Sequence, residues 1–175
     1  MTAAFYIAAF VAIVATFLAV SRHNAVHALL YLVVSLLSLA LIFLLLGAPF
    51  VAALEVIIYA GAIMVLFVFV VMMLSMGPKT KGGERQWLTP SVWIGPAILV
   101  SILLAELLYV ADAAPFPNGY VAQVPPREVA MSLLGPYLLG VELVSMLLLS
   151  ALIGAYHLAY HLGWRQASKK GGAAP

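Results

Sequence analysis

The sequence predicts an all-α integral membrane protein with five transmembrane helices. Of its 175 residues, 66% are hydrophobic and only 8% are charged, whereas a soluble domain carries about 25% charged residues. Five apolar segments are also long enough to cross a bilayer, which takes about 20 residues each. No connection between these segments is long enough to form a water-soluble domain.

The five expected spans are separated by polar residues, glycine and proline, which end helices. We expect these spans to cover approximately residues 2–20, 25–46, 53–76, 91–111 and 135–157. Residues 1–164 should then form a single membrane domain, and residues 165–175 are expected to be a disordered tail.

The basic residues predict the orientation of the chain. Successive spans cross the membrane in opposite directions, so alternate connections lie on the same side. One side then holds seven basic residues, namely Arg22, Lys79, Lys81, Arg85, Arg165, Lys169 and Lys170. The other side holds only Arg127. Because cytoplasmic loops are enriched in lysine and arginine, the N-terminus is expected outside and the C-terminus in the cytoplasm.

Three acidic residues fall within the expected spans, namely Glu55, Glu106 and Glu142. All three lie in the outer half of the membrane, where the chain has no basic residue to pair with them. A carboxyl group is expensive in a bilayer and usually faces protein or water, so a proton site is one interpretation. The alternative is a protonated acid that links two helices by a hydrogen bond. We favour function for Glu55 and Glu142, and the structural role for Glu106, which lies near the surface.

The third expected span, residues 53–76, has an unusual composition in its first half. After Glu55 it contains the run Tyr59-Ala60-Gly61-Ala62, and glycine inside a helix costs roughly 1 kcal/mol relative to alanine. Such a run allows a π-bulge or a change of register. Small residues also allow close helix packing, which is their commoner use in membranes. The residues alone favour packing.

The sequence offers no chemistry for bond-making catalysis. It contains no cysteine, which excludes thiolate-held zinc and iron–sulfur sites within this chain. His157 and His161 share a helical face, but no carboxylate accompanies them at the expected inner surface, so they are interpreted as interfacial residues. No phosphate-binding loop or nucleophile motif is present. We therefore expect no catalytic residue, metal or cofactor in this chain, and no nucleic-acid partner.

Three stretches carry a family resemblance. The longest is EVIIYAGAIMVLFVFVVMML, from Glu55 to Leu74; the others are HALLYLVVSLL, from His27 to Leu37, and PYLLGVELVSMLLLSALIGA, from Pro136 to Ala155. They resemble the family formed by subunit J of bacterial NADH–quinone oxidoreductase, which is respiratory complex I, and mitochondrial chain 6. The resemblance covers most of residues 1–76 and 129–160.

This resemblance implies a core subunit of the membrane arm, in the bacterial inner membrane, that holds no redox centre. FMN, iron–sulfur clusters and quinone would belong to other subunits. Its implied partners are membrane lipid, the quinone-site subunit, the small three-helix subunits and the antiporter-like subunits. The implied function is to couple quinone reduction to proton translocation through a switchable third helix.

The resemblance also implies roles for individual residues. Glu55 and Glu142 correspond to acids of the family, in the third and the last helix. A π-bulge is implied around the Tyr-Ala-Gly-Ala run, and the helix gate would comprise Tyr59, Gly61, Val65 and Phe67. The family often has Pro-Phe before the last acid, whereas this chain has Gly140-Val141.

Two other classes of function remain open from the sequence. One is transport, either by a stand-alone proton or cation channel or by a subunit of a multisubunit cation/proton antiporter. The other is a purely structural scaffold, in which the intramembrane acids would affect assembly but not pumping.

Overall fold

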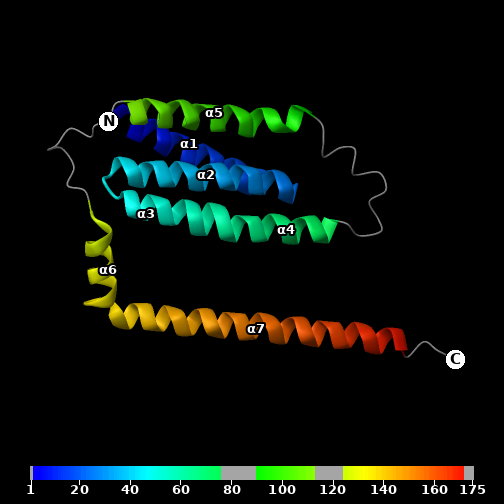
Figure 1. Cartoon of the computed structure of the whole chain (residues 1–175). Coiled ribbons are helices and arrows are strands. Elements are labelled where there is room, and N and C mark those ends of the chain that lie inside the picture. The colour runs from blue at the N-terminus through cyan, green and yellow to red at the C-terminus, as the bar shows by residue number, and fades with distance from the viewer. Residues whose placement is uncertain (1, 76–89, 113–123, 172–175) are drawn as a thin grey trace. The chain divides into compact units, whose positions relative to one another are not determined.

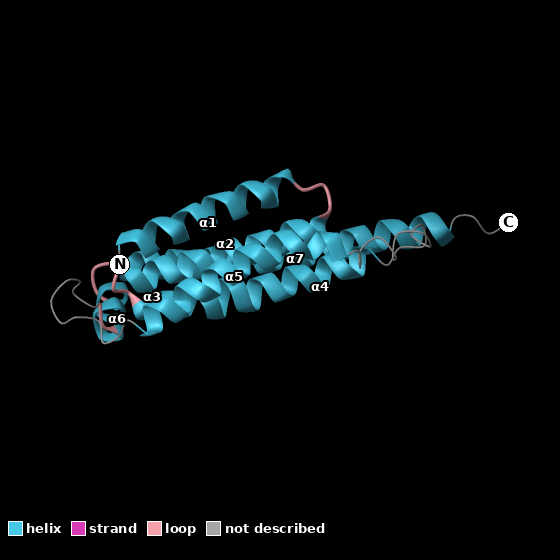
Figure 2. Cartoon of the chain, turned by 90° about the horizontal axis from the view of Figure 1, so that it is seen from above, coloured by secondary structure: helices cyan, strands magenta, loops and turns pink. Residues whose placement is uncertain are grey.

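All the secondary structure in the described part of the chain is helical. The structure is a computed structural model that describes residues 2–75, 90–112 and 124–171, and every element in these ranges is a helix (Figure 2). Five segments are long and apolar enough to span a membrane, which confirms the predicted all-α class. They are Thr2–Ser21, Ala25–Leu45, Pro49–Leu74, Trp93–Asp112 and Leu138–His161.

The chain divides into two compact units, residues 1–125 and residues 126–175, and each is described by itself. The first unit contains α1 (Thr2–Ser21), α2 (Ala25–Leu45), α3 (Pro49–Leu54), the π-helix η1 (Glu55–Ile63), α4 (Met64–Ser75) and α5 (Pro90–Asp112). The second contains α6 (Pro126–Leu134) and α7 (Leu138–Gly171). Figure 1 shows both units along the chain.

Helix α2 is the centre of the first unit, because it packs against α1, α3, η1, α4 and α5. Its tightest neighbour is α1, whose buried face consists mainly of small side chains, namely Ala4, Ala8, Val11, Ala12 and Ala15. Alanines spaced four residues apart lie on one face of a helix and let two backbones approach closely. The core is completed by Val34 and Leu41 of α2 and Leu103 of α5.

Hydroxyl groups join α1 to α2 inside this apolar interface. The Thr16 and Ser35 hydroxyl oxygens lie 2.7 Å apart, and Thr16 also donates to the carbonyl oxygen of Ala12 at 2.8 Å. The Ser38 hydroxyl, which is fully buried, donates to the Val34 carbonyl of its own helix. A hydrogen bond between membrane helices, such as the one that joins Thr16 to Ser35, contributes roughly 0.6 kcal/mol.

The turn from α2 into α3 depends on one glycine. Gly47 has a positive φ of 81°, a conformation that costs glycine nothing because it has no Cβ. The N–H groups of Gly47 and Ala48 bond back to the Leu44 and Phe43 carbonyls and so cap the end of α2. Pro49 then begins α3, at the first helical position, where its missing N–H is not needed.

Several helix bounds differ from those expected. The third span begins at Pro49, four residues before the expected residue 53, because proline starts this helix and does not merely end the previous segment. Helix α7 continues to Gly171 and so includes much of the expected disordered tail. No proline interrupts it between residues 138 and 171. Most of the connection expected between the third and fourth spans, and part of the connection between the fourth and fifth, lie outside the described residues.

Candidate functional site

The third span is interrupted by a nine-residue π-helix, Glu55–Ile63, which includes the whole Tyr-Ala-Gly-Ala run. At its beginning the N–H of Glu55 still donates to the Val51 carbonyl, four residues back. At its end the N–H of Met64 donates to the Tyr59 carbonyl, five residues back. This change from four to five residues defines the π form. π-Helical segments are rare in proteins, and those that occur often lie at functional sites. The bulge implied by the family resemblance is therefore present.

Gly61 is the residue on which the π-helix depends most directly. A Cβ added to Gly61 would lie 3.1 Å from the carbonyl oxygen of Val56, five residues earlier. This is tighter than nearly all real Cβ contacts, so a side chain here would push against the backbone of the π-helix itself. The three β-branched residues Val56, Ile57 and Ile58 precede it, and such residues crowd a regular helix. Close packing against another helix, which the residues alone favoured for Gly61, is not what its surroundings in this chain show.

The other expected gate residues are exposed in this chain. Tyr59, Val65 and Phe67 are 51%, 66% and 52% exposed, and all belong to the continuous segment η1–α4. Met64, between them, is the buried residue of this region, at 2% exposure. The third span is thus held to the first unit through a narrow face, and its predicted gate side chains are free to meet lipid or another protein.

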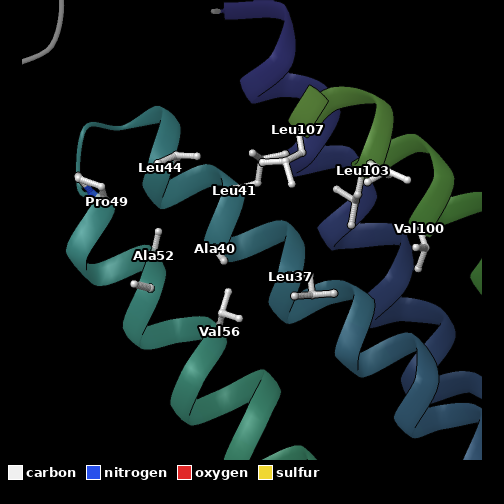
Figure 3. A pocket seen from close by; sticks show the side chains of 12 residues that line it. Leu37, Ala40, Leu41, Leu44, Pro49, Ala52, Val56, Val100, Leu103 and Leu107 are labelled. Carbon is white, nitrogen blue, oxygen red and sulfur yellow. The ribbon is translucent and has the colours of Figure 1, made fainter. Parts of the chain in front are cut away.

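An apolar cavity of about 390 Å³ lies beside the beginning of the π-helix. Figure 3 shows side chains from α2, α3, η1 and α5 around it. Its lining is entirely apolar and consists of Leu37, Ala40, Leu41, Leu44, Pro49, Ala52, Ala53, Val56, Val100, Leu103, Leu104 and Leu107. Val56 belongs to both features, because its side chain lines the cavity and its carbonyl faces Gly61.

The two acids expected in a proton path occupy different units. Glu55 is the first residue of η1 and is half-buried. Because the third span starts at Pro49, Glu55 lies about 9 Å along the helix from that end at 1.5 Å per residue. Glu142 lies in the first turns of α7 and is exposed. The preceding Gly140 has open space where a Cβ would be, so the glycine is not required sterically within this chain.

Glu106 is buried within the first unit of this chain. It is only 7% exposed, and neither carboxyl oxygen has a hydrogen-bond partner among the described residues. The backbone of Ala8 in the neighbouring helix α1 faces this carboxyl group, and the expected hydrogen bond between the two helices stays a prediction. The sequence carries no signal for this burial, because apolar residues flank Glu106 on every face of α5 and the covered face is set by α1 and α2.

The histidines of α7 contact each other. The rings of His157 and His161 pack edge to face, with their centroids 4.4 Å apart. Within residues 2–75, 90–112 and 124–171, no three histidine, cysteine or acidic side chains gather as metal ligands. The distinctive features of the described residues are thus a π-helix, a single glycine within it and an adjacent apolar cavity.

Comparison with known proteins gives a consistent result across the chain. Residues 4–158 match the family described as NADH-ubiquinone/plastoquinone oxidoreductase chain 6. NADH-quinone oxidoreductase subunit J of Pseudomonas aeruginosa is 57% identical over 159 residues, which cover 90% of this chain and 96% of that protein. Subunit J of Escherichia coli K12 is 51% identical over 158 residues, covering 90% and 86%. Subunit J of Buchnera aphidicola from Schizaphis graminum is 47% identical over 154 residues, covering 88% and 94%.

The matched region overlaps all five apolar helices and contains the π-helix and both expected acids. Together with an identity of about half to relatives of nearly the same length, this leaves no ambiguity about kinship. The chain belongs to the NADH-ubiquinone/plastoquinone oxidoreductase chain 6 family, and it is a multi-pass membrane protein of that family.

Proposed function

We propose that this protein is the subunit J of a bacterial proton-translocating NADH–quinone oxidoreductase and that its third span acts as a conformational gate. The proposal rests on the π-helix Glu55–Ile63 in a chain whose relatives are named as this subunit. The protein crosses the inner membrane five times, with its N-terminus outside and its C-terminus in the cytoplasm. The support for that orientation is the distribution of lysine and arginine.

The gate is a change between π and α forms of residues Glu55–Ile63. Removing the bulge would rotate the following segment, which carries Val65 and Phe67, relative to the preceding one. A switch of this kind requires two packings that differ by only a few kcal/mol. The narrow buried face of the third span and the apolar cavity beside Val56 support such a change, since little packing must be broken and space is available.

The gate controls proton movement through the intramembrane acids. Glu55 begins the π-helix, so its position relative to the following turn changes whenever the bulge moves. Glu55 and Glu142 act as proton-carrying groups along a water path, and the gate opens or closes that path. This is supported by the cost of placing a carboxyl group in a bilayer without a function.

The chain supplies no redox chemistry in this proposal. FMN, iron–sulfur clusters and quinone are bound by other subunits, in keeping with a sequence that has no cysteine. The exposed surfaces of η1, α4 and α7 bind neighbouring membrane subunits: the quinone-site subunit, the small three-helix subunits and the antiporter-like subunits. Their apolar character equally suits lipid.

The test uses an affinity tag on this chain in its native host, with either Glu55 or Glu55→Gln. We expect both forms to co-purify with flavin- and iron–sulfur-containing subunits. Reconstituted wild-type complex should couple NADH oxidation to proton uptake, whereas Glu55→Gln should reduce protons translocated per electron pair. Glu128→Gln, in the exposed helix α6, is the matched control and should leave coupling unchanged.

Other outcomes would point elsewhere. If the chain purifies alone or as a homo-oligomer, a channel is correct and the proposed function fails. If it purifies with membrane subunits but without flavin and iron–sulfur proteins, it belongs to a cation/proton antiporter. If Glu55→Gln and the corresponding Glu142→Gln alter assembly but not pumping per assembled complex, the chain is a structural scaffold.

A further inference from the structure

Glu106 is a buried acid for which the proposed gate has no use. Its side chain lies on the packed face of α5, with Leu103 and Val110 a turn away on either side. The same face packs against α1 and α2. Both carboxyl oxygens are sealed from solvent and have no hydrogen-bond partner among the described residues. The burial is produced by this chain alone, so the site does not depend on another subunit.

An ionised carboxylate is not tolerable in these surroundings. An unpaired charge in an apolar interior costs so much that the group binds a proton and becomes neutral. The residues of α1 and α2 around the interface are apolar, and the buried polar side chains there, Ser35 and Ser38, already donate to backbone carbonyl groups. Described basic residues such as Arg22 and His23 lie at the opposite end of α1.

The ligand that fits the site is a proton. A metal cation requires several oxygen ligands, about six for magnesium or calcium, whereas this site offers one carboxyl group. A side chain from another subunit is also excluded, because the oxygens are already enclosed by α1 and α5. Protonation needs no additional ligand and removes the charge.

We propose that Glu106 is a proton-binding site inside the α1–α5 interface, neutral when the interface is closed as it is here. The proton can be exchanged only when α1 and α5 separate, because no polar group among the described residues connects the carboxyl to solvent in the closed form. We further propose that α1 and α5 separate during turnover of the enzyme, and this part rests on the proposed function. The neutral, sealed state of Glu106 in the resting protein does not depend on the proposed function.

The test is infrared spectroscopy of the assembled complex transferred into D2O. A neutral carboxyl group has a carbonyl band, and this band shifts to lower frequency when its proton is replaced by deuterium. We expect one such band to be lost in Glu106→Gln, to stay unshifted in resting complex in D2O, and to shift after turnover with NADH and quinone. Glu128→Gln, an exposed acid outside the spans, should lose no band.

A second variant keeps the test decisive if Glu106→Gln fails to assemble. Ala8→Ser places a hydroxyl beside the carboxyl group and should lower the frequency of the same band without removing it. Absence of any neutral carboxyl band in the resting complex, or loss of no band in Glu106→Gln, would show that Glu106 is ionised and overturn the proposal. Rapid deuterium shift at rest would show that the interface is open, and no shift after turnover would show a permanently fixed proton; either result overturns the proposed gated exchange. If the chain does not co-purify with redox subunits but the purified protein still shows the unshifted band, only the proposed function is refuted. The proton-binding site at Glu106 would then stand.

Discussion

Gly61 shows how a single residue can favour a rare backbone conformation. In a regular helix, glycine is simply a weak helix former. Here a Cβ added at this position would lie 3.1 Å from the Val56 carbonyl oxygen, so it would crowd the backbone of the π-helix. Any side chain at this position therefore has two effects in the same direction, since it strengthens the α-helix and crowds the π-helix.

Gly61→Ala should shift the third span towards the α form. The gain in helix propensity is about 1 kcal/mol, which changes the ratio of the two forms roughly fivefold, and the crowding against Val56 adds to it. We expect normal assembly but reduced quinone reduction and fewer protons pumped per NADH, with Gly61→Val showing a larger loss. These rates are measured on reconstituted complex at matched subunit content.

Gly154→Ala in α7 provides the matched control, because a Cβ there meets nothing within 4 Å. It should leave both rates unchanged. If Gly61→Ala and Gly61→Val are as active and as tightly coupled as wild type, the π-helix has no role in turnover and the gating proposal is wrong.

The third span acts as one element despite its three parts. Helices α3 and α4 and the π-helix between them form a continuous segment from Pro49 to Leu74. It packs on α2 mainly through Ala52 at one end and Met64 further along. The cavity lies between these helices and α5, so the element has room to move on the side where it is held.

Filling the cavity should restrain this movement. Ala52→Leu places three additional carbon atoms among Leu41, Leu44 and Val56, where the cavity holds about 390 Å³. We expect the variant to assemble, because the space is already present, and to lose coupled activity, because Val56 can no longer repack. Assembly is checked by native gel electrophoresis and coupling by proton uptake in proteoliposomes.

Ala105→Leu adds the same atoms on the exposed side of α5 and should have little effect on either measurement. Full coupling in Ala52→Leu would mean that the cavity is not used during turnover. Failure of Ala52→Leu to assemble would instead indicate overpacking, which typically costs about 1–3 kcal/mol. In that case Ala40→Leu, which fills the same cavity from the α2 side, replaces it in the test.

The orientation of the whole molecule in the membrane is open to a direct test, since the natural sequence has no cysteine. Thr2→Cys and Glu128→Cys lie on the proposed outer side and His23→Cys on the inner side, and all three side chains are exposed. We expect a membrane-impermeant maleimide to label the first two in spheroplasts and only the third in inverted vesicles. The opposite pattern would overturn the N-out, C-in orientation.

The number of candidate spans, the all-helical class and the π-helix could be anticipated from the residues and the family they resemble. Apolar segments of about 20 residues are recognised along the chain without knowing their neighbours. The Tyr59–Ala62 run likewise lies within a single helix, so its unusual form is a local property. The starting point of the third span did not follow from the residues, because Pro49 can end one helix or begin the next.

The faces on which these helices meet were decided by the tertiary structure. The alanines of α1 are buried because α2 packs against them. The cavity beside Val56 forms because α2 also packs against the third span. Glu106 is the clearest case: its depth along α5 was correctly placed near one end, but its burial depends on the side of α5 that α1 covers. Hydropathy reports position along a helix, whereas contact depends on rotation about the helix axis, and that rotation is set by the neighbouring helices.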